Sequence, residues 1–444
     1  MASIVARLRG VPRDTRLFLA YTLCANIALG TFTLDFNLYL LSLDFREDFI
    51  GLASALQTFA MAGTAFMLGG LLGRHGVWRV VVLSLVAFVL LSSLMSLSSH
   101  AWMILPVAIL WGANTSFLFS TVMPFVVELS DESRRSKVAS LTVSTSMVAT
   151  TIGSLIGGWV PRLVGILMDV ERDSVLAFRG ALFAGIALAA VGLVPLLLMS
   201  QERRLPVVDD DEEDEAPEPG VTPGLPRMPG PTQRRRVIVF TAVGGLMSLG
   251  AGMTFPFFNV YLDSIGASPG QIGMIFAGAS IFAAGTTLLG PRIVSSLGQE
   301  RALALGRLSP VPLLLMLIVT PSLGLATLAH LARTASQGLG WSMESTMMST
   351  ALRGRARRAI FGYRSGTWNI GYSISSLVGG ALIVRWGYDP TFAIYAGFML
   401  IAMTLFYGYF RYVSPVEDSR RIPAGVEEAI VEPVDRPVLR SGRG

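Results

Sequence analysis

The apolar residues of this chain fall into blocks of about twenty, separated by short polar or charged turns. A helix needs about twenty apolar residues to cross the roughly 30 Å hydrocarbon core of a bilayer, whereas barrel strands alternate over about ten residues. The pattern therefore predicts an all-α membrane protein of twelve transmembrane helices, with eleven also compatible. The expected helices lie near residues 15–41, 49–72, 78–98, 101–127, 137–164, 175–199, 237–262, 269–294, 301–320, 322–348, 359–384 and 390–412.

Composition agrees with this pattern. Hydrophobic residues make up 52% of the 444, charged residues 15%, and the mean hydropathy is +0.59, a balance unsuited to a chain folded in water. The arginine-rich segment 1–16 runs into the first apolar block without a small-residue cleavage site. This predicts a signal anchor, not a removed signal peptide.

Basic residues gather in alternate loops. The loops on one side of the membrane hold more basic residues than the loops on the other. The residues of the richer side are Arg7, Arg9, Arg13, Arg16, Arg74, Arg79, Arg134, Arg135, Lys137, Arg292, Arg301, Arg353, Arg355, Arg357 and Arg358. Cytoplasmic loops carry the excess of Lys and Arg, so we expect a multi-pass protein of the cell membrane with both termini in the cytoplasm. The net charge of +5 then reports topology, and no nucleic-acid partner is expected.

A polar segment divides the chain into two parts. Residues 201–236 combine an acidic run with many prolines and glycines, which predicts a disordered cytoplasmic linker. It separates a six-helix bundle over 1–200 from a second over 237–412. Residues 413–444 are predicted to form a cytoplasmic tail.

The two parts repeat each other. Adding 222 to a position in the first part reaches its counterpart in the second over most of the length. The matching pairs include Gly30 with Gly252, Asn37 with Asn259, Gly51 with Gly273, Gly63 with Gly285, Ser154 with Ser376, and Gly158 with Gly380. A constant offset indicates a parallel duplication, with a pseudo-twofold axis along the membrane normal.

The stretch from Gly69 to Arg79 resembles the Gly-x-x-x-Asp-Arg-x-Gly-x-Arg-Arg signature of the major facilitator superfamily. It keeps Gly69, Arg74, Gly76 and Arg79, and departs at the acidic position, which is Gly73, and at Trp78. In that family the acidic residue helps to lock the cytoplasmic face through ion pairs. The resemblance implies a secondary transporter working by alternating access, although Arg74 and Arg79 are also explained as topological anchors.

Another acid is a candidate for the missing charge. Glu128, at the end of the fourth predicted helix and followed by Arg134 and Arg135, resembles the family's pattern there. We therefore expect a gate from the residues Arg74, Gly76, Arg79, Glu128, Arg134, Glu344 and Arg364.

The segment Gly153–Gly158 is similar to the Gly-Pro-x-x-Gly-Gly element of drug/proton antiporters, with Ser154 in place of proline. This resemblance favours export over import. The glycines also have a structural explanation, because small residues let membrane helices approach closely, and the second half repeats them.

Ionisable side chains inside a membrane are costly, so each is a functional candidate. In the tenth helix a polar stripe recurs at spacings of three and four, which places it on one interior face; its members are His330, Arg333, Gln337, Trp341 and Glu344. From a start near Ser322, Arg333 lies about 16 Å along the helix and Glu344 about 33 Å. Arg333 is the candidate for solute binding, paired with an anionic solute, with Asp35 or with Glu344. Arg364 is expected to pair with Glu344 or to extend to the surface.

The first helix offers Asn26, Asp35 and Asn37. Asn26 and Asn37 share a face, and Asp35 lies 180° from Asn26, so the two faces cannot line one cavity equally. Asn37 recurs in the repeat, but Asp35 becomes Phe257, so Asp35 is preferred as a proton or solute site, with an outer-gate ion pair as the alternative. Asn114 is a further candidate, and an interhelical hydrogen bond explains it equally well.

No constellation typical of a soluble enzyme is present: the histidines are scattered, no metal-ligand spacing occurs, and no phosphate loop is found. We therefore expect no enzyme activity and no cofactor, with a proton gradient as the energy source. The expected partners are a small-molecule solute and the lipid bilayer, and the expected state is a monomer. The sequence favours proton-coupled efflux of a small organic solute; a solute importer and a non-transporting receptor or scaffold are the alternatives.

Overall fold

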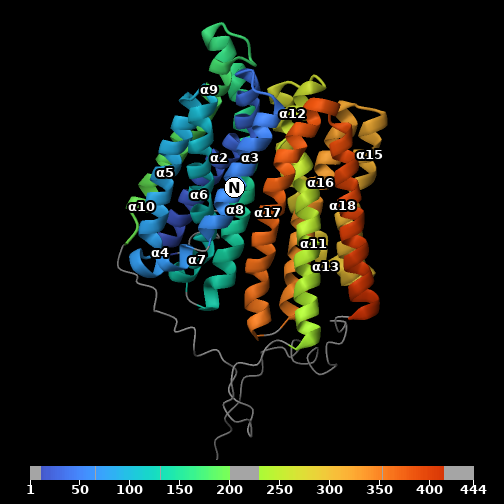
Figure 1. Cartoon of the computed structure of the whole chain (residues 1–444). Helices are drawn as coiled ribbons and strands as arrows, with labels where there is room; N and C mark the ends of the chain where they lie inside the picture. Colours follow the sequence, from blue (N-terminus) through green and yellow to red (C-terminus); the bar gives the residue numbers. More distant parts are fainter. Residues whose placement is uncertain (1–11, 66, 131, 201–229, 353, 415–444) are drawn as a thin grey trace, which may run out of the picture.

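The structure, a computed structural model, describes residues 12–65, 67–130, 132–200, 230–352 and 354–414. The predicted linker over 201–229 and the tail beyond 414 lie outside these residues. The described helices form two neighbouring bundles, one from each half of the chain (Figure 1).

The first bundle, which we call the N-half, contains α2 to α10. Its helices are α2 (Arg13–Ser42), α3 (Glu47–Ala65), α4 (Leu68–His75), α5 (Val77–Leu97), α6 (Ala101–Ser120), α7 (Val122–Leu129), α8 (Glu132–Met168), α9 (Val175–Val191) and α10 (Leu193–Leu197).

The second bundle, the C-half, contains α11 to α18 and a terminal π-helical turn. Its elements are α11 (Pro231–Thr254), α12 (Phe258–Ser264), α13 (Pro269–Leu297), α14 (Gln299–Leu308), α15 (Val311–Val319), α16 (Leu323–Ala351), α17 (Gly354–Trp386), α18 (Asp389–Gly408) and η1 (Tyr409–Val413).

Nine helical segments of the described chain are long and apolar enough to cross a membrane. The remaining long segments are α3 with α4, α16 and α17. These carry more polar residues and, in α16 and α17, buried charges. Counted together, the segments are consistent with the twelve predicted helices. Large apolar side chains on the outer surface, such as Leu288 and Val319, are more than four-fifths exposed, as expected for a surface that contacts lipid.

Several boundaries differ from the prediction. Residues 231–236, which were predicted to belong to the linker, form the first turns of α11. Pro231 suits the start of a helix because a backbone N–H at that position would have no intrahelical acceptor, so its absence costs nothing. The predicted helix over 237–262 is broken between Thr254 and Phe258. Pro256 explains the break, because a proline has no backbone N–H to donate and its ring clashes with the preceding helical turn.

The halves meet along two equivalent contacts. In the first, α3 packs against α17, and a Cβ added at Gly51 would collide with the Ser376 carbonyl oxygen. In the second, α13 packs against α8, and a Cβ added at Gly273 would lie 2.5 Å from the Ser154 carbonyl oxygen. Gly51 and Ser154 are the repeat partners of Gly273 and Ser376. The glycines therefore permit backbone contact at positions related by the pseudo-twofold axis, because small residues let membrane helices approach closely.

Candidate functional site

A cavity of about 250 Å³ lies between the two halves. Its walls are mainly aromatic and uncharged, with hydroxyl and amide groups among the rings, and consist of Phe32, Thr33, Phe36, Asn37, Ser54, Gln57, Thr58, Trp111, Phe255, Pro256, Asn259, Phe276 and Tyr372. A concave, largely apolar pocket with a few polar groups at the interface of two bundles is the usual form of a small-molecule site. We call it the central cavity.

Two hydrogen bonds close one end of the central cavity. The side-chain amide of Asn37 donates to the Pro256 carbonyl at 2.6 Å, and that of Asn259 donates to the Leu34 carbonyl at 2.7 Å. Asn259 is the repeat partner of Asn37, and residue 256 is the repeat partner of residue 34. The same bond is thus made twice across the pseudo-twofold axis. We call this pair the asparagine latch.

Further contacts between the halves lie at the latched end. The Tyr388 hydroxyl donates to Glu47 at 3.0 Å, and Arg46 donates to the Val384 carbonyl at 3.4 Å. Burial is the main reason that the pKa of Tyr388 is raised above its usual value, and the neighbouring Glu47 carboxylate adds to the shift. Tyr388 therefore remains a donor at neutral pH. These contacts secure the latched end beyond the asparagines.

The break between α11 and α12 forms part of the cavity wall. Phe255 and Pro256 line the cavity, and the Pro256 carbonyl is available to Asn37. Broken membrane helices commonly mark solute sites, because their backbone groups face a cavity and not lipid. The break therefore supports the central cavity as the functional site.

Arg333 lies directly behind this wall. It is 6% exposed, and its guanidinium carbon is 4.3 Å from the ring centre of Phe255 and 4.7 Å from that of Phe258. Its only hydrogen bond among the described residues is to His330 Nδ1 at 2.8 Å, and its Nε and NH1 have no partner there. A fixed positive charge thus stands one aromatic ring away from the cavity.

Neither acid expected as an internal partner for Arg333 is paired with it. Glu344 instead accepts from Arg364 Nε at 2.7 Å and from Arg307 at 3.1 Å. All three side chains are at least 98% buried, and Arg307 also donates to Gln337 at 2.8 Å. The pairing of Arg364 with Glu344 is therefore confirmed. Arg307 was not among the residues predicted from the sequence.

Asp35 is fully buried on the side of α2 that faces α8. A Cβ added at Gly157 would lie 2.6 Å from its Oδ2, and neither carboxyl oxygen has a hydrogen-bond partner among the described residues. The cavity is lined by Thr33 and Asn37, not by Asp35. The acid preferred from the sequence is thus behind the cavity wall, on the opposite side of the first helix.

The other candidates are dispersed. Asn26 donates to Thr22 within its own helix at 2.8 Å. Asn114 donates to the Ser84 carbonyl at 3.0 Å, which is the interhelical bond considered as its alternative role. Trp341 is 48% exposed, and its ring centre is 6.0 Å from the guanidinium carbon of Arg364. None of these lines the central cavity.

The gate candidates of the N-half lie at the end opposite the latch. Arg74, Gly76, Arg79 and Arg134 are exposed, and Glu128 is half-buried. Glu344 and Arg364, by contrast, lie inside the C-half. The predicted gate residues therefore do not form one cluster in this conformation.

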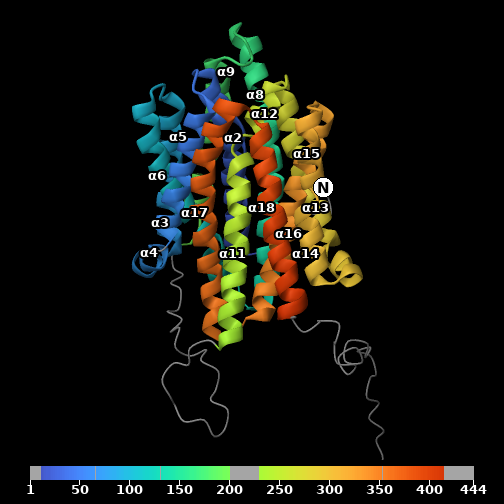
Figure 2. The ribbon, with the colours of Figure 1, turned by 45° about the vertical axis from the view of Figure 1, so that its right-hand side comes forward.

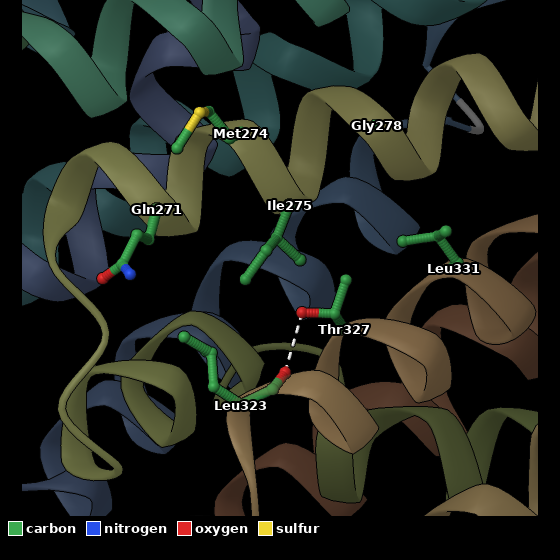
Figure 3. Close-up of a pocket in the computed structure, with 7 residues that line it drawn as sticks. All are labelled: Gln271, Met274, Ile275, Gly278, Leu323, Thr327 and Leu331. Atoms are coloured by element: carbon green, nitrogen blue, oxygen red, sulfur yellow. Dashed lines mark hydrogen bonds between the residues drawn. The ribbon is translucent and has the colours of Figure 1, made fainter.

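A second hollow, of about 340 Å³, lies between α13 and α16 within the C-half. Figure 3 shows its walls, with the Thr327 hydroxyl donating to the Leu323 carbonyl of its own helix at 2.7 Å. Gln271 is likewise engaged locally, in the cap of α13. Both polar side chains of these walls already make local hydrogen bonds, and the central cavity has more polar side chains, so the central cavity is the better candidate. Among the described residues, no group of three His, Cys, Asp or Glu could hold a metal.

Comparison with known proteins decides the family. The sequence profile of the Major Facilitator Superfamily matches residues 18–352 and 240–442. The chain belongs to this superfamily. The expected family and fold are thereby confirmed, and the protein is a transporter, not an enzyme.

Solved structures share the fold at low sequence identity. The nucleoside transporter NupG has a TM-score of 0.69 at 13% identity over 90% of this chain and 99% of its own. A bacterial homologue of the human lysosomal transporter Spinster, inward-facing and occupied, has 0.67 at 12% over 90% and 96%; a D-xylose–proton symporter has 0.64 at 14% over 88% and 96%. No curated protein sequence matches the chain.

Proposed function

We propose that this superfamily member is a proton-coupled secondary transporter that exports a small organic solute through the central cavity. The observation that carries the proposal is the position of that cavity. It lies between the two repeated halves and next to the asparagine latch, to which each half contributes one donor. Transporters built from such repeats alternate access to a fixed site by rocking one half against the other, so that contacts between the halves form at one end of the cavity and break at the other.

The orientation follows from the loop charges. The exposed arginines Arg74, Arg79 and Arg134 lie at the end opposite the latch, and basic loops favour the cytoplasmic side. The latched end then faces outward, and the cavity is reached from the cytoplasm. We also propose that the protein resides in the cell membrane as a monomer, with both termini in the cytoplasm.

Asp35 is the proposed proton site. An ionised carboxylate without hydrogen bonds is costly in an apolar interior, so Asp35 is expected to carry a proton in this conformation. It packs against α8, and α8 also packs against α13 of the opposite half. Movement between the halves would hydrate Asp35 and release the proton, with no cofactor required.

Export rests on the resemblance of Gly153–Gly158 to the antiporter element. Transport in the opposite direction is the principal alternative, and one solved relative is a symporter. A non-transporting receptor or scaffold is favoured only by Gly73, which stands where the family carries its acidic gate residue.

Proteoliposomes with an internal pH indicator test these alternatives. We expect an outward solute gradient to drive proton movement in the opposite direction, for at least one solute of a panel of nucleosides, pentoses and aromatic carboxylates. Proton flux in the same direction as the solute would indicate symport. Absence of solute-dependent flux and of counterflow for the whole panel would favour the non-transporting alternative.

A further inference from the structure

We propose that the central cavity takes a small organic anion with an aromatic or apolar body, and that Arg333, uncovered by displacement of Phe255, is the counter-ion of its acidic group. This proposal rests on the proposed transport function and names its solute class.

The first argument is the electrostatic state of Arg333. A guanidinium stays protonated in proteins, and its planar donors match carboxylate, phosphate and sulfonate groups. Burying such a charge without an acid is costly, yet Glu344 is already shared by two other arginines, and neither carboxyl oxygen of Asp35 is hydrogen-bonded within the described chain. Two donor nitrogens of Arg333, Nε and NH1, are unsatisfied among the same residues. The site is thus built for an anion that the protein does not itself supply.

The second argument is the arrangement around the charge. Phe255 lines the cavity, and the guanidinium carbon of Arg333 lies 4.3 Å from the centre of its ring. His330 is hydrogen-bonded to Arg333. Its ring stacks on that of Phe258, with the ring centres 5.0 Å apart, and lies tilted against that of Phe276 at 4.1 Å. Cation–π contacts stabilise the guanidinium in this covered position.

The third argument is that the cover can move. Phe255 lies in the interruption between α11 and α12, where Pro256 prevents a continuous helical hydrogen-bond ladder. Short breaks of this kind absorb backbone rotation with little loss of structure. Rotation at Phe255 would bring the guanidinium to the cavity surface, while Arg333 stays fixed in α16.

The fourth argument is the wall itself. None of the described residues that line the cavity carries a charge, so the field of Arg333 is uncompensated there. The rings of Phe32, Phe36 and Trp111 offer an apolar surface to the body of the solute. A cationic solute would meet repulsion from Arg333, and a neutral one would leave its donors unsatisfied.

Thiol labelling tests this charge directly. Cys24 is the single cysteine, so Thr33→Cys in a Cys24→Ser background places one thiol on the exposed wall. Its labelling rates with 2-sulfonatoethyl and 2-(trimethylammonium)ethyl methanethiosulfonate give an anion-to-cation ratio. We expect Arg333→Gln to lower this ratio on the order of ten-fold, with Arg333→Lys close to the parent. Arg301→Gln, which removes an exposed arginine of α14, is the matched control and should leave the ratio unchanged.

A second variant guards against misfolding of Arg333→Gln. Phe255→Ala removes the covering ring and should raise the ratio several-fold. An unchanged ratio in either folded variant overturns the proposal. Failure of Thr33→Cys to react with either reagent would instead contradict a cavity open to the cytoplasm, and therefore the proposed function on which this inference rests.

Protection experiments test the solute class. With neutral methyl methanethiosulfonate as the labelling reagent, 2-naphthoate should slow modification of Thr33→Cys more than the uncharged 2-naphthamide does. Arg333→Gln should abolish the difference. Equal protection by the two compounds, or protection by neither, contradicts an anion site.

Discussion

Asn37 and Asn259 make equivalent hydrogen bonds in opposite directions between the two halves. Asn37 donates to the carbonyl of Pro256 and Asn259 to that of Leu34, and positions 34 and 256 are repeat partners. Asn37 reaches into the break before α12, and Asn259 reaches an unbroken stretch of α2. Figure 2, turned from Figure 1, shows α12 near the upper end of α2. The two bonds of the latch are related by the pseudo-twofold axis, but only the C-half has a broken helix beside them. The duplication therefore closes one end of the cavity symmetrically and still leaves a solute site whose two walls differ.

The first prediction concerns this latch. Asn37→Ala and Asn259→Ala each remove one hydrogen bond worth about 1 kcal/mol, so each should raise the population open at the latched end by about five-fold. The double variant should raise it further. Distances between spin labels at His100 and Pro321, on the two halves at that end, measure the population. Asn26→Ala, which breaks a bond within one helix, is the control and should leave it unchanged.

The second prediction concerns Asp35. Asp35→Asn should abolish solute-dependent proton flux, because an amide cannot carry the proton, while solute counterflow persists. The protein should remain folded, since the carboxyl group makes no hydrogen bond in the described chain. Asp263→Asn in α12 is the matched control. Normal coupling in Asp35→Asn would show that the proton is carried elsewhere.

The third prediction concerns the buried ion cluster of the C-half. Glu344→Gln leaves Arg307 and Arg364 without their shared acid, and breaking a buried pair in this way costs about 3 to 5 kcal/mol. Thermal unfolding in detergent should show a lower melting temperature than for Glu300→Gln, a control on the neighbouring α14. Similar melting temperatures for the two variants would mean that the cluster is hydrated or replaceable.

Sequence reasoning found the architecture but only part of the site. The constant offset between repeats identified Asn37, Gly51 and their counterparts, because symmetry constrains both members of each pair. The environment of Arg333 could not be found in this way, since its aromatic neighbours come from another helix, at a break present in only one half. The ring wall itself was hidden among ordinary apolar residues, although Pro256 inside a predicted helix was a signal for the break.

The fourth prediction concerns pH and the contact between Tyr388 and Glu47. The pKa of Tyr388 is raised in the folded protein, chiefly by burial, so its contribution to stability is fully present below the unfolded value of about 10 and is lost as pH rises toward the folded value. Tyr388→Phe should cost about 1 kcal/mol at pH 7, and this difference should disappear above pH 10. Melting temperatures of the parent protein and of Tyr388→Phe, measured at pH 7 and above pH 10, give this difference. A difference that is constant with pH would contradict the assignment.

The last prediction separates crowded from open glycines along the same helices. Gly51→Ala and Gly273→Ala would each press a methyl group against a carbonyl oxygen of the other half, so the latched conformation should become strained and spin-label distances at the latched end should lengthen. Gly63 and Gly285 are their controls, since they lie on α3 and α13, are repeat partners, and have no neighbour within 4 Å of an added Cβ. Alanine there should leave the distances unchanged and stabilise the helix by about 0.5 to 1 kcal/mol. If both pairs behaved alike, the effect would come from helix propensity and not from contact between the halves, and the glycine contacts would have no part in closing this end.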